Sequence, residues 1–136
     1  NQACLDHTFE SKICSCLVNP RACHETELNY LPADTPKKIA VIGAGPAGLT
    51  AATIAAQRGH AVHLYEAASE TGGQFNMAKV IPGKEEYAET IRYYQRELEL
   101  HKVDVRLGAH VTPESLGADD FDAVHGVSTV PCGCGM

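Results

Sequence analysis

The stretch KIAVIGAGPAGL, residues 38–49, decides the fold of this chain of 136 residues. Its first five residues suit a buried strand, and they lead directly into Gly-x-Gly-x-x-Gly, formed by Gly43, Gly45 and Gly48. Pro46 fits the first turn of a helix, because the N–H that proline lacks has no helical partner there. The stretch therefore predicts a parallel strand, a tight turn and a helix in direct succession.

The glycine-rich turn is followed by a helix, a second strand and an acidic residue. The helix is rich in alanine and is expected to end at Gly59, a typical residue just past a helix C-terminus. An apolar segment, residues 61–65, follows and ends on Glu66, which lies 18 residues after Gly48. Strand, glycine turn, helix, strand and acid in this order are the fingerprint of a dinucleotide-binding βαβ unit. The predicted fold class is α/β, with a partial Rossmann-like FAD- or dinucleotide-binding domain over residues 36–136.

The glycine-rich turn is predicted to hold a diphosphate. Gly43 permits the tight turn, Gly45 lets the backbone approach a pyrophosphate, and Gly48 lets the helix pack closely on the strand. Ala44 and Ala47 complete the turn and the helix start, where unpaired N–H groups and the helix dipole attract an anion. The alternative is an α/β unit with coincidental glycines.

Glu66 and the loop after it narrow the choice of nucleotide. A carboxylate at the end of the second strand accepts hydrogen bonds from ribose hydroxyls and repels a 2′-phosphate, which favours FAD, NAD or ADP over NADP. Gly73 and Gln74 follow in a glycine-containing loop, where a flavin-bound chain often folds back over the cofactor. We predict that both contact the cofactor; the alternative is a flexible connection.

Three more elements are expected beyond this loop. A turn at residues 82–83 precedes a helix over about 84–101, and alternating residues at 103–107 predict a strand. A further strand is expected to start within residues 121–124. One apolar face of the helix carries residues spaced by four, three and four: Tyr87, Ile91, Tyr94 and Leu98.

Composition excludes several classes of function. The net charge of −6 leaves no basic footprint for nucleic acid. The sequence contains neither an apolar run of the roughly 18 residues that a membrane span needs nor an N-terminal signal peptide. A soluble, cytoplasmic protein without nucleic-acid or membrane partners is expected. A complete Rossmann-type domain needs more strands than can be counted here, so we expect a piece of a longer polypeptide.

Cysteines concentrate at the N-terminus, in residues 1–35, which are predicted to be irregular and to end in a proline-containing linker. Clustered thiols in a cytosolic protein favour metal or redox use over disulfides. A [4Fe–4S] cluster needs four thiolates, and free thiols are the alternative that spacing alone leaves open. The six cysteines are Cys4, Cys14, Cys16, Cys23, Cys132 and Cys134.

Two linked stretches carry a family resemblance. NQAC at residues 1–4 with SCLVNPRACHE at residues 15–25 resembles the iron–sulfur segment of the NADH:flavin oxidoreductase–trimethylamine dehydrogenase family, in particular its 2,4-dienoyl-CoA reductases. The glycine fingerprint, GGQFN at residues 72–76 and IPGKEE at residues 81–86 resemble the FAD-binding domain that follows it there.

The resemblance implies ligands for a cluster. The family motif is C-x₂-C-x₃-C-x₁₁-C, and the eleven residues between Cys4 and Cys16 match its last interval. These two cysteines therefore correspond to the third and fourth ligands, and the first two would precede Asn1. Cys14 and Cys23 lie off the motif. The resemblance also places Lys84 near the cofactor and the backbone of Val111 near its adenine.

The resemblance further implies an electron-transfer role, in which no residue of this chain serves as a catalytic acid or base. In such enzymes NAD(P)H reduces FAD, electrons pass singly through the cluster to FMN in a preceding β/α barrel, and FMN reduces an enoyl thioester. In the amine dehydrogenase branch of the family, electrons flow in the opposite direction, from the substrate, and the corresponding domain holds ADP in this site. A nucleotide-binding module without catalysis is the alternative from another class.

Overall fold

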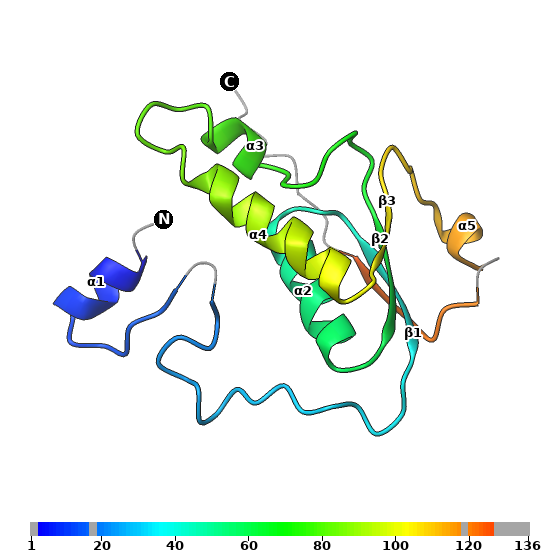
Figure 1. Cartoon of the computed structure of the whole chain (residues 1–136), viewed down its shortest axis with the longest axis horizontal. Helices are drawn as coiled ribbons and strands as arrows, with labels where there is room; N and C mark the ends of the chain where they lie inside the picture. Colours follow the sequence, from blue (N-terminus) through cyan, green and yellow to red (C-terminus); the bar gives the residue numbers. More distant parts are fainter. Residues whose placement is uncertain (1–2, 17–18, 118–119, 127–136) are drawn as a thin grey trace. The chain divides into compact units, whose positions relative to one another are not determined.

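The computed structural model describes residues 3–16, 19–117 and 120–126, apart from the side chains of Ala3 and Cys4. By its internal contacts the chain divides into two compact units, Asn1–Leu31 and Pro32–Met136. The predicted boundary, between residues 35 and 36, lies four residues further along the chain. Figure 1 shows the elements, which are α1 (Ala3–Phe9), β1 (Lys38–Ile42), α2 (Pro46–Gln57), β2 (Ala61–Tyr65), α3 (Phe75–Ala78), α4 (Tyr87–Leu100), β3 (Asp104–Arg106), α5 (Pro113–Gly117) and β4 (Ala123–Gly126).

The first unit contains a short helix where irregular chain was predicted. α1 has the sequence ACLDHTF, which holds neither glycine nor proline to interrupt a helix. Beyond it, the N–H of Glu10 donates to the carbonyl oxygen of Asp6, and the N–H of Lys12 to that of His7. The prediction was wrong for these seven residues, because a cysteine-rich composition does not exclude helix where helix breakers are absent.

Four parallel strands form the sheet of the second unit, in the order β3-β2-β1-β4. β1 lies in the interior of the sheet, where Val41 is in register with Leu64 of β2 and with His125 of β4. Helix α2 connects β1 to β2 as a crossover between parallel strands. The predicted α/β class is therefore confirmed. The strand expected to start within residues 121–124 is β4.

Helix α2 ends where the sequence predicts. Gly59 has a left-handed backbone conformation with φ +94°, which L residues with side chains rarely adopt. The N–H groups of Gly59 and His60 donate to the carbonyl oxygens of Ala56 and Ala55 at 2.9 and 3.2 Å. These two bonds satisfy the last carbonyls of the helix and turn the chain toward β2.

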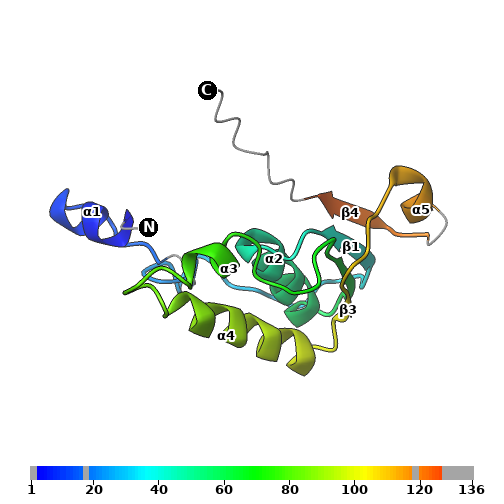
Figure 2. The ribbon, with the colours of Figure 1, turned by 90° about the horizontal axis from the view of Figure 1, so that it is seen from above.

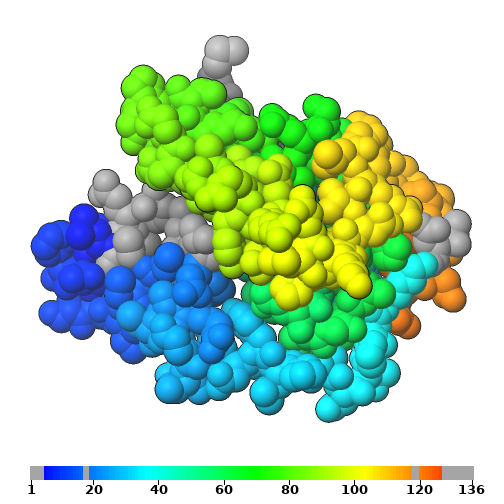
Figure 3. All heavy atoms as spheres, in the orientation of Figure 1, coloured from blue at the N-terminus to red at the C-terminus, as the bar shows by residue number. Residues whose placement is uncertain are grey.

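Two helices cover one face of the sheet. α2 packs on β1 and β2, and α4 packs along α2. Figure 2 shows both on the same side, with α5 on the opposite side. In the space-filling view of Figure 3, atoms of α4, drawn in yellow-green to yellow, cover the middle of this face. The core of the unit consists of buried apolar side chains, among them Val41, Leu49, Ala52, Val62, Leu64, Ile91, Tyr94 and Leu98.

α4 begins three residues later than the predicted helix over 84–101. The N–H groups of Tyr87 and Ala88 donate to the carbonyl oxygens of Lys84 and Glu85, three residues earlier, so this segment forms turns rather than α-helix. The sequence pattern did not predict α3, whose Phe75 ring packs edge-on against Tyr87 with 4.6 Å between ring centroids. The predicted strand over 103–107 is shorter, Asp104–Arg106. In the part of the chain that the structure describes, every helix is too short or too polar to cross a bilayer.

The crossing of α2 over β1 depends on the absence of a side chain at Gly48. A Cβ placed there would lie 1.8 Å from the carbonyl oxygen of Gly43 and 3.7 Å from Cγ1 of Val41. The first distance is far shorter than any real contact, so the two backbones can approach this closely only with glycine at this position. Gly48 is buried in the first turns of α2.

Replacing Gly48 by alanine is expected to destabilise the domain. Because the clashing atom is a backbone oxygen, relief requires a shift of the helix or of the turn, and we expect a loss of about 1–3 kcal/mol or more. Urea unfolding followed by circular dichroism measures it. Gly117→Ala in α5 is the matched control, because a Cβ there meets nothing within 4 Å. Equal stability of the two variants would contradict the close crossing.

Candidate functional site

The glycine turn, residues 43–48, lies at the carboxyl ends of β1 and β2. The N–H of Gly43 donates to the carbonyl oxygen of Tyr65, the last residue of β2, at 2.7 Å. This bond extends the pairing of the two strands into the turn. Ligands of open parallel sheets bind at this edge, where strands end and helices begin.

Glu66 connects the glycine turn to the second strand through both carboxylate oxygens. Its Oε2 accepts a hydrogen bond from the N–H of Ala44 at 2.6 Å, and its Oε1 accepts one from the N–H of Ala68 at 2.9 Å. The carboxylate is half-buried, and its own N–H donates to the carbonyl oxygen of Arg106 at 3.0 Å. The acid predicted to bind ribose therefore also fixes the turn that is predicted to bind phosphate.

A second loop lies against the glycine turn. The N–H of Gly72 donates to the carbonyl oxygen of Ala44 at 2.8 Å, and a Cβ on Gly73 would lie 3.0 Å from Cα of Gly45. Gly72 and Gly73 have φ values of +118° and +53°, which favour glycine at both positions. The structure thus brings Gly73 beside the predicted phosphate-binding backbone. Gly72 was not among the predicted site residues, although the glycine pair that follows Glu66 by a few residues is a signal visible in the sequence.

The start of α2 offers open backbone to an anion. Gly45 is the N-cap and provides no side-chain cap, and a Cβ on it would meet nothing within 4 Å. Ala47 follows in the first turn and is exposed. The first N–H groups of a helix have no partner within it and carry the positive end of its dipole. This backbone cradle fits the diphosphate of a dinucleotide such as FAD.

The other predicted cofactor residues lie apart from the glycine turn in the sequence. Gln74 is the exposed N-cap of α3, and Lys84 is exposed in the turns between α3 and α4. Val111 lines a cavity of about 250 Å³ together with Tyr65 and Arg106, beside the end of β2. Contacts of all three with a cofactor stay predictions.

A polar cluster holds Arg106 at the edge of this cavity. Oδ2 of Asp104 accepts hydrogen bonds from Nε of Arg106 at 3.0 Å and from Nδ1 of His63 at 2.8 Å when that nitrogen is protonated. Nη1 of Arg106 donates to the hydroxyl of Tyr65 at 3.2 Å. Burial favours the neutral acid, but the bonds from Arg106 and His63 outweigh it and hold the pKa of Asp104 below its ordinary value. The guanidinium is therefore committed to Asp104 and Tyr65.

The first unit does not assemble a metal site among its described residues. Sγ of Cys16 is exposed and accepts a hydrogen bond from the N–H of Asn19 at 3.4 Å. Cys4 lies in α1, and its side chain is outside the description. No group of three or more potential ligands gathers within residues 3–16, 19–117 and 120–126. The described residues alone do not fit a cluster, and the pairing of Cys4 with Cys16 rests on sequence.

Comparison with known proteins identifies the fold family. The profile of the NAD(P)-binding Rossmann-like domain matches residues 41–115, more than half of the chain. The chain belongs to this family. The match begins within β1 and includes the glycine turn, Glu66 and the 71–73 loop.

Relatives of this Rossmann-like domain are oxidoreductases by name. A metal reductase from Desulforamulus reducens is 41% identical, over 85% of this chain and 17% of the reductase. An N,N-dimethylglycine/sarcosine dehydrogenase from Chromohalobacter salexigens is 40% identical, over 77% of this chain and 16% of the dehydrogenase. A solved structure of 2-naphthoyl-CoA reductase with 2-naphthoyl-CoA has a TM-score of 0.88 and 35% identity, over 93% of this chain and 20% of that one. The chain thus spans about a fifth or less of the length of these relatives.

Removing the charge of Glu66 is expected to loosen the Rossmann-like domain before any ligand binds. In Glu66→Gln one carboxylate oxygen becomes an NH₂ donor, which leaves the N–H of Ala44 or of Ala68 without its acceptor. We expect the free energy of unfolding to fall by about 1–3 kcal/mol in urea titrations.

Glu70→Gln is the matched control for this substitution. Its carboxylate is exposed and lies 3.7 Å from Nζ of Lys79, an ion pair expected to contribute less than about 1 kcal/mol. If the free energy of unfolding falls no more in Glu66→Gln than in this control, Glu66 does not fix the glycine turn as described.

Proposed function

We propose that this chain is the FAD-binding part of a flavin-dependent oxidoreductase and that it binds the ADP moiety of the cofactor at the glycine turn. The observation that carries the proposal is the meeting of three groups at one sheet edge: the open backbone at Gly45, the helix start behind it, and the carboxylate of Glu66. A site for an ADP moiety requires open backbone and a helix N-terminus for the diphosphate, and an acid for the ribose.

In this proposal the residues of the chain bind and orient, and FAD supplies the redox chemistry when bound. The N–H groups at the turn and at the start of α2 donate to the diphosphate oxygens. Glu66 keeps acceptor capacity beyond its two backbone bonds, because an ionised carboxylate has about four lone-pair sites. Those sites accept hydrogen bonds from the ribose hydroxyls and disfavour a 2′-phosphate.

The oxidoreductase assignment is supported by the names of the relatives and by the family resemblance of residues 1–25 and 72–86. We propose NAD(P)H as electron donor, FMN as electron acceptor and an enoyl thioester as substrate, all bound by other parts of a longer polypeptide. The reduction of 2,4-dienoyl-CoA in fatty-acid β-oxidation is the reaction that the resemblance favours. A cytoplasmic location is part of the same proposal.

The iron–sulfur cluster is the part of the proposal for which this chain supplies the fewest residues. We propose Cys4 and Cys16 as two of its four ligands in a polypeptide that also carries Cys-x₂-Cys before Asn1. Iron and acid-labile sulfide, measured after anaerobic purification of that polypeptide, should each reach about four per chain. Their absence would overturn the cluster and leave the FAD site untouched.

An amine dehydrogenase with ADP in this site is the second candidate. The 40% identity to an N,N-dimethylglycine/sarcosine dehydrogenase favours it. FAD absorbs visible light and ADP does not, so the absorbance spectrum of the nucleotide released from this domain separates the two. A domain that binds a nucleotide but belongs to a polypeptide without redox activity would instead be a non-catalytic module.

Nucleotide preference tests the proposed site directly. Isothermal titration of the chain should detect ADP and FAD, and adenosine 2′-phosphate 5′-diphosphate should bind at least about ten-fold more weakly, because Glu66 repels its added phosphate. Glu66→Gln should weaken ADP binding and narrow this ratio. Equal binding of ADP and its 2′-phosphorylated form to the wild-type chain would contradict the role of Glu66.

A further inference from the structure

The loop that carries Gly72 and Gly73 is held on both sides of the glycine pair. Residues 71–73 lie between β2 and α3 and belong to neither. Two successive glycines allow this backbone its conformation, but they have no side chains that could pack. After the pair, the N–H groups of Phe75 and Asn76 donate to the carbonyl oxygens of Gly72 and Gly73. Before the pair, the position of the loop against Ala44 and Gly45 depends on what holds Thr71.

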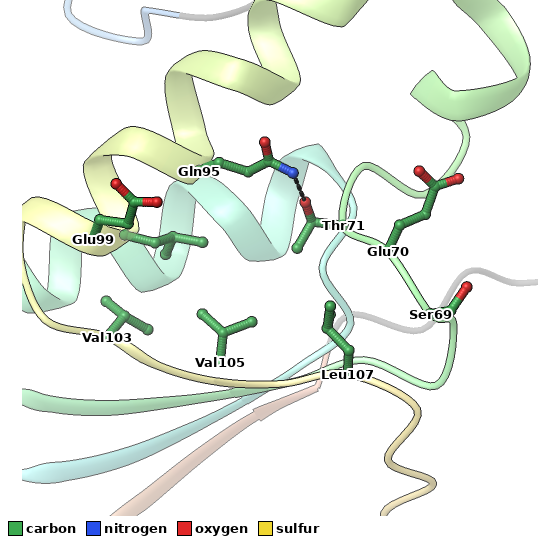
Figure 4. A pocket seen from close by; sticks show the side chains of 9 residues that line it. Ser69, Glu70, Thr71, Gln95, Glu99, Val103, Val105 and Leu107 are labelled. Atoms are coloured by element: carbon green, nitrogen blue, oxygen red, sulfur yellow. Dashed lines mark hydrogen bonds between the residues drawn. The ribbon is translucent and has the colours of Figure 1, made fainter.

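Thr71 is held through both its side chain and its main chain. It is 5% exposed, and its Oγ1 accepts a hydrogen bond from Nε2 of Gln95 at 3.0 Å. Its carbonyl oxygen accepts a second from Nδ2 of Asn76 in α3 at 2.9 Å. Figure 4 shows the side chain of Gln95 reaching from α4 to Thr71.

Ile91 of α4 packs against Gly72, where a Cβ would lie 2.7 Å from its Cδ1, but Thr71 is joined to α4 beside an open space. The residues around the bond from Gln95 line a cavity of about 560 Å³ between α4, β3 and this loop, with Val103, Val105 and Leu107 on the side of the sheet (Figure 4). Because this space is open, the link between α4 and the loop here is polar. Gln95 itself is exposed, so its bond is expected to contribute a modest amount.

The helix that carries Gln95 is fixed by the core. Ile91, Tyr94 and Leu98 are buried, and the hydroxyl of Tyr94 lies 2.6 Å from Oγ1 of Thr50 in α2. α4 is therefore fixed by its packing on α2, and the bond from Gln95 connects Thr71 to that helix.

We propose that Gln95 and Thr71 are positioning residues for the nucleotide site: they hold the 71–73 loop against the glycine turn and so preorganise the backbone that meets the diphosphate. This inference rests on the proposed function. The inference adds two residues that lie far from the glycine turn in the sequence and outside the Gly-x-Gly-x-x-Gly motif. Preorganisation raises affinity by lowering the ordering cost of binding.

Isothermal titration of the full chain with ADP tests the proposal. Gln95→Leu and Thr71→Val each remove one partner of the bond and should raise the Kd about three- to ten-fold. Thr71→Ser keeps the hydroxyl and should keep the Kd within about two-fold. The double variant should bind no more weakly than the weaker single variant, because both remove the same interaction.

Gln57→Leu is the matched control. It removes a glutamine amide that also bonds α4, through Oε2 of Glu97 at 3.2 Å, but from the C-terminal end of α2 rather than from the loop. It should leave the Kd for ADP within about two-fold. Amide hydrogen exchange at Gly72 should accelerate in Gln95→Leu and stay unchanged in Gln57→Leu.

The outcomes separate this inference from the proposed function. If the wild-type chain does not bind ADP, the proposed function fails and this inference fails with it. If the wild-type chain binds ADP and Gln95→Leu binds equally well, only the positioning role is overturned. If Gln57→Leu weakens ADP binding as much as Gln95→Leu does, the effect is a general loosening of α4, and the positioning role is also overturned.

Discussion

The close approach of α2 to β1 is the constraint on which the rest of the domain depends. With no side chain at Gly48, the helix backbone lies against the carbonyl of Gly43, and only three residues, 43–45, separate the end of β1 from the start of α2. This contact aims the start of the helix at the sheet edge where Glu66 also lies. A side chain at this position would push the helix away from the carbonyl of Gly43 and so shift the start of the helix relative to that carboxylate.

The site is built from backbone that other groups hold in place. The turn receives its position from Glu66 at one side and from the 71–73 loop at the other, through Ala44 in both cases. Such an arrangement leaves the N–H groups at the helix start available to a ligand while the surrounding chain is already ordered. The same carboxylate serves structure and recognition, which explains why a group predicted only as a ribose ligand also stabilises the unliganded domain.

The sequence alone predicted the βαβ unit well, because every signal in it is local. Pro46 marks the helix start, Gly59 marks its end, and Glu66 follows the second strand, and each lies where it was expected. The contact of Gly73 with Gly45 joins residues far apart in the chain and depends on backbone angles that no periodic pattern encodes. Gln95 lies on the polar side of an amphipathic helix, where a residue that bonds a loop looks like any solvated glutamine. α1 was missed for the opposite reason, since its residues suit a helix but stand in a cysteine-rich segment.

The most direct test of the central claim, that the glycine turn and Glu66 form one nucleotide site, is a two-dimensional ¹H–¹⁵N spectrum of the chain titrated with ADP. Saturable shifts should concentrate at the amides of Ala44, Gly45, Ala47, Gly48 and Gly73, with smaller changes at residues 66–68. Shifts confined to the cavity between α4 and β3, or scattered over the surface without saturation, would contradict it.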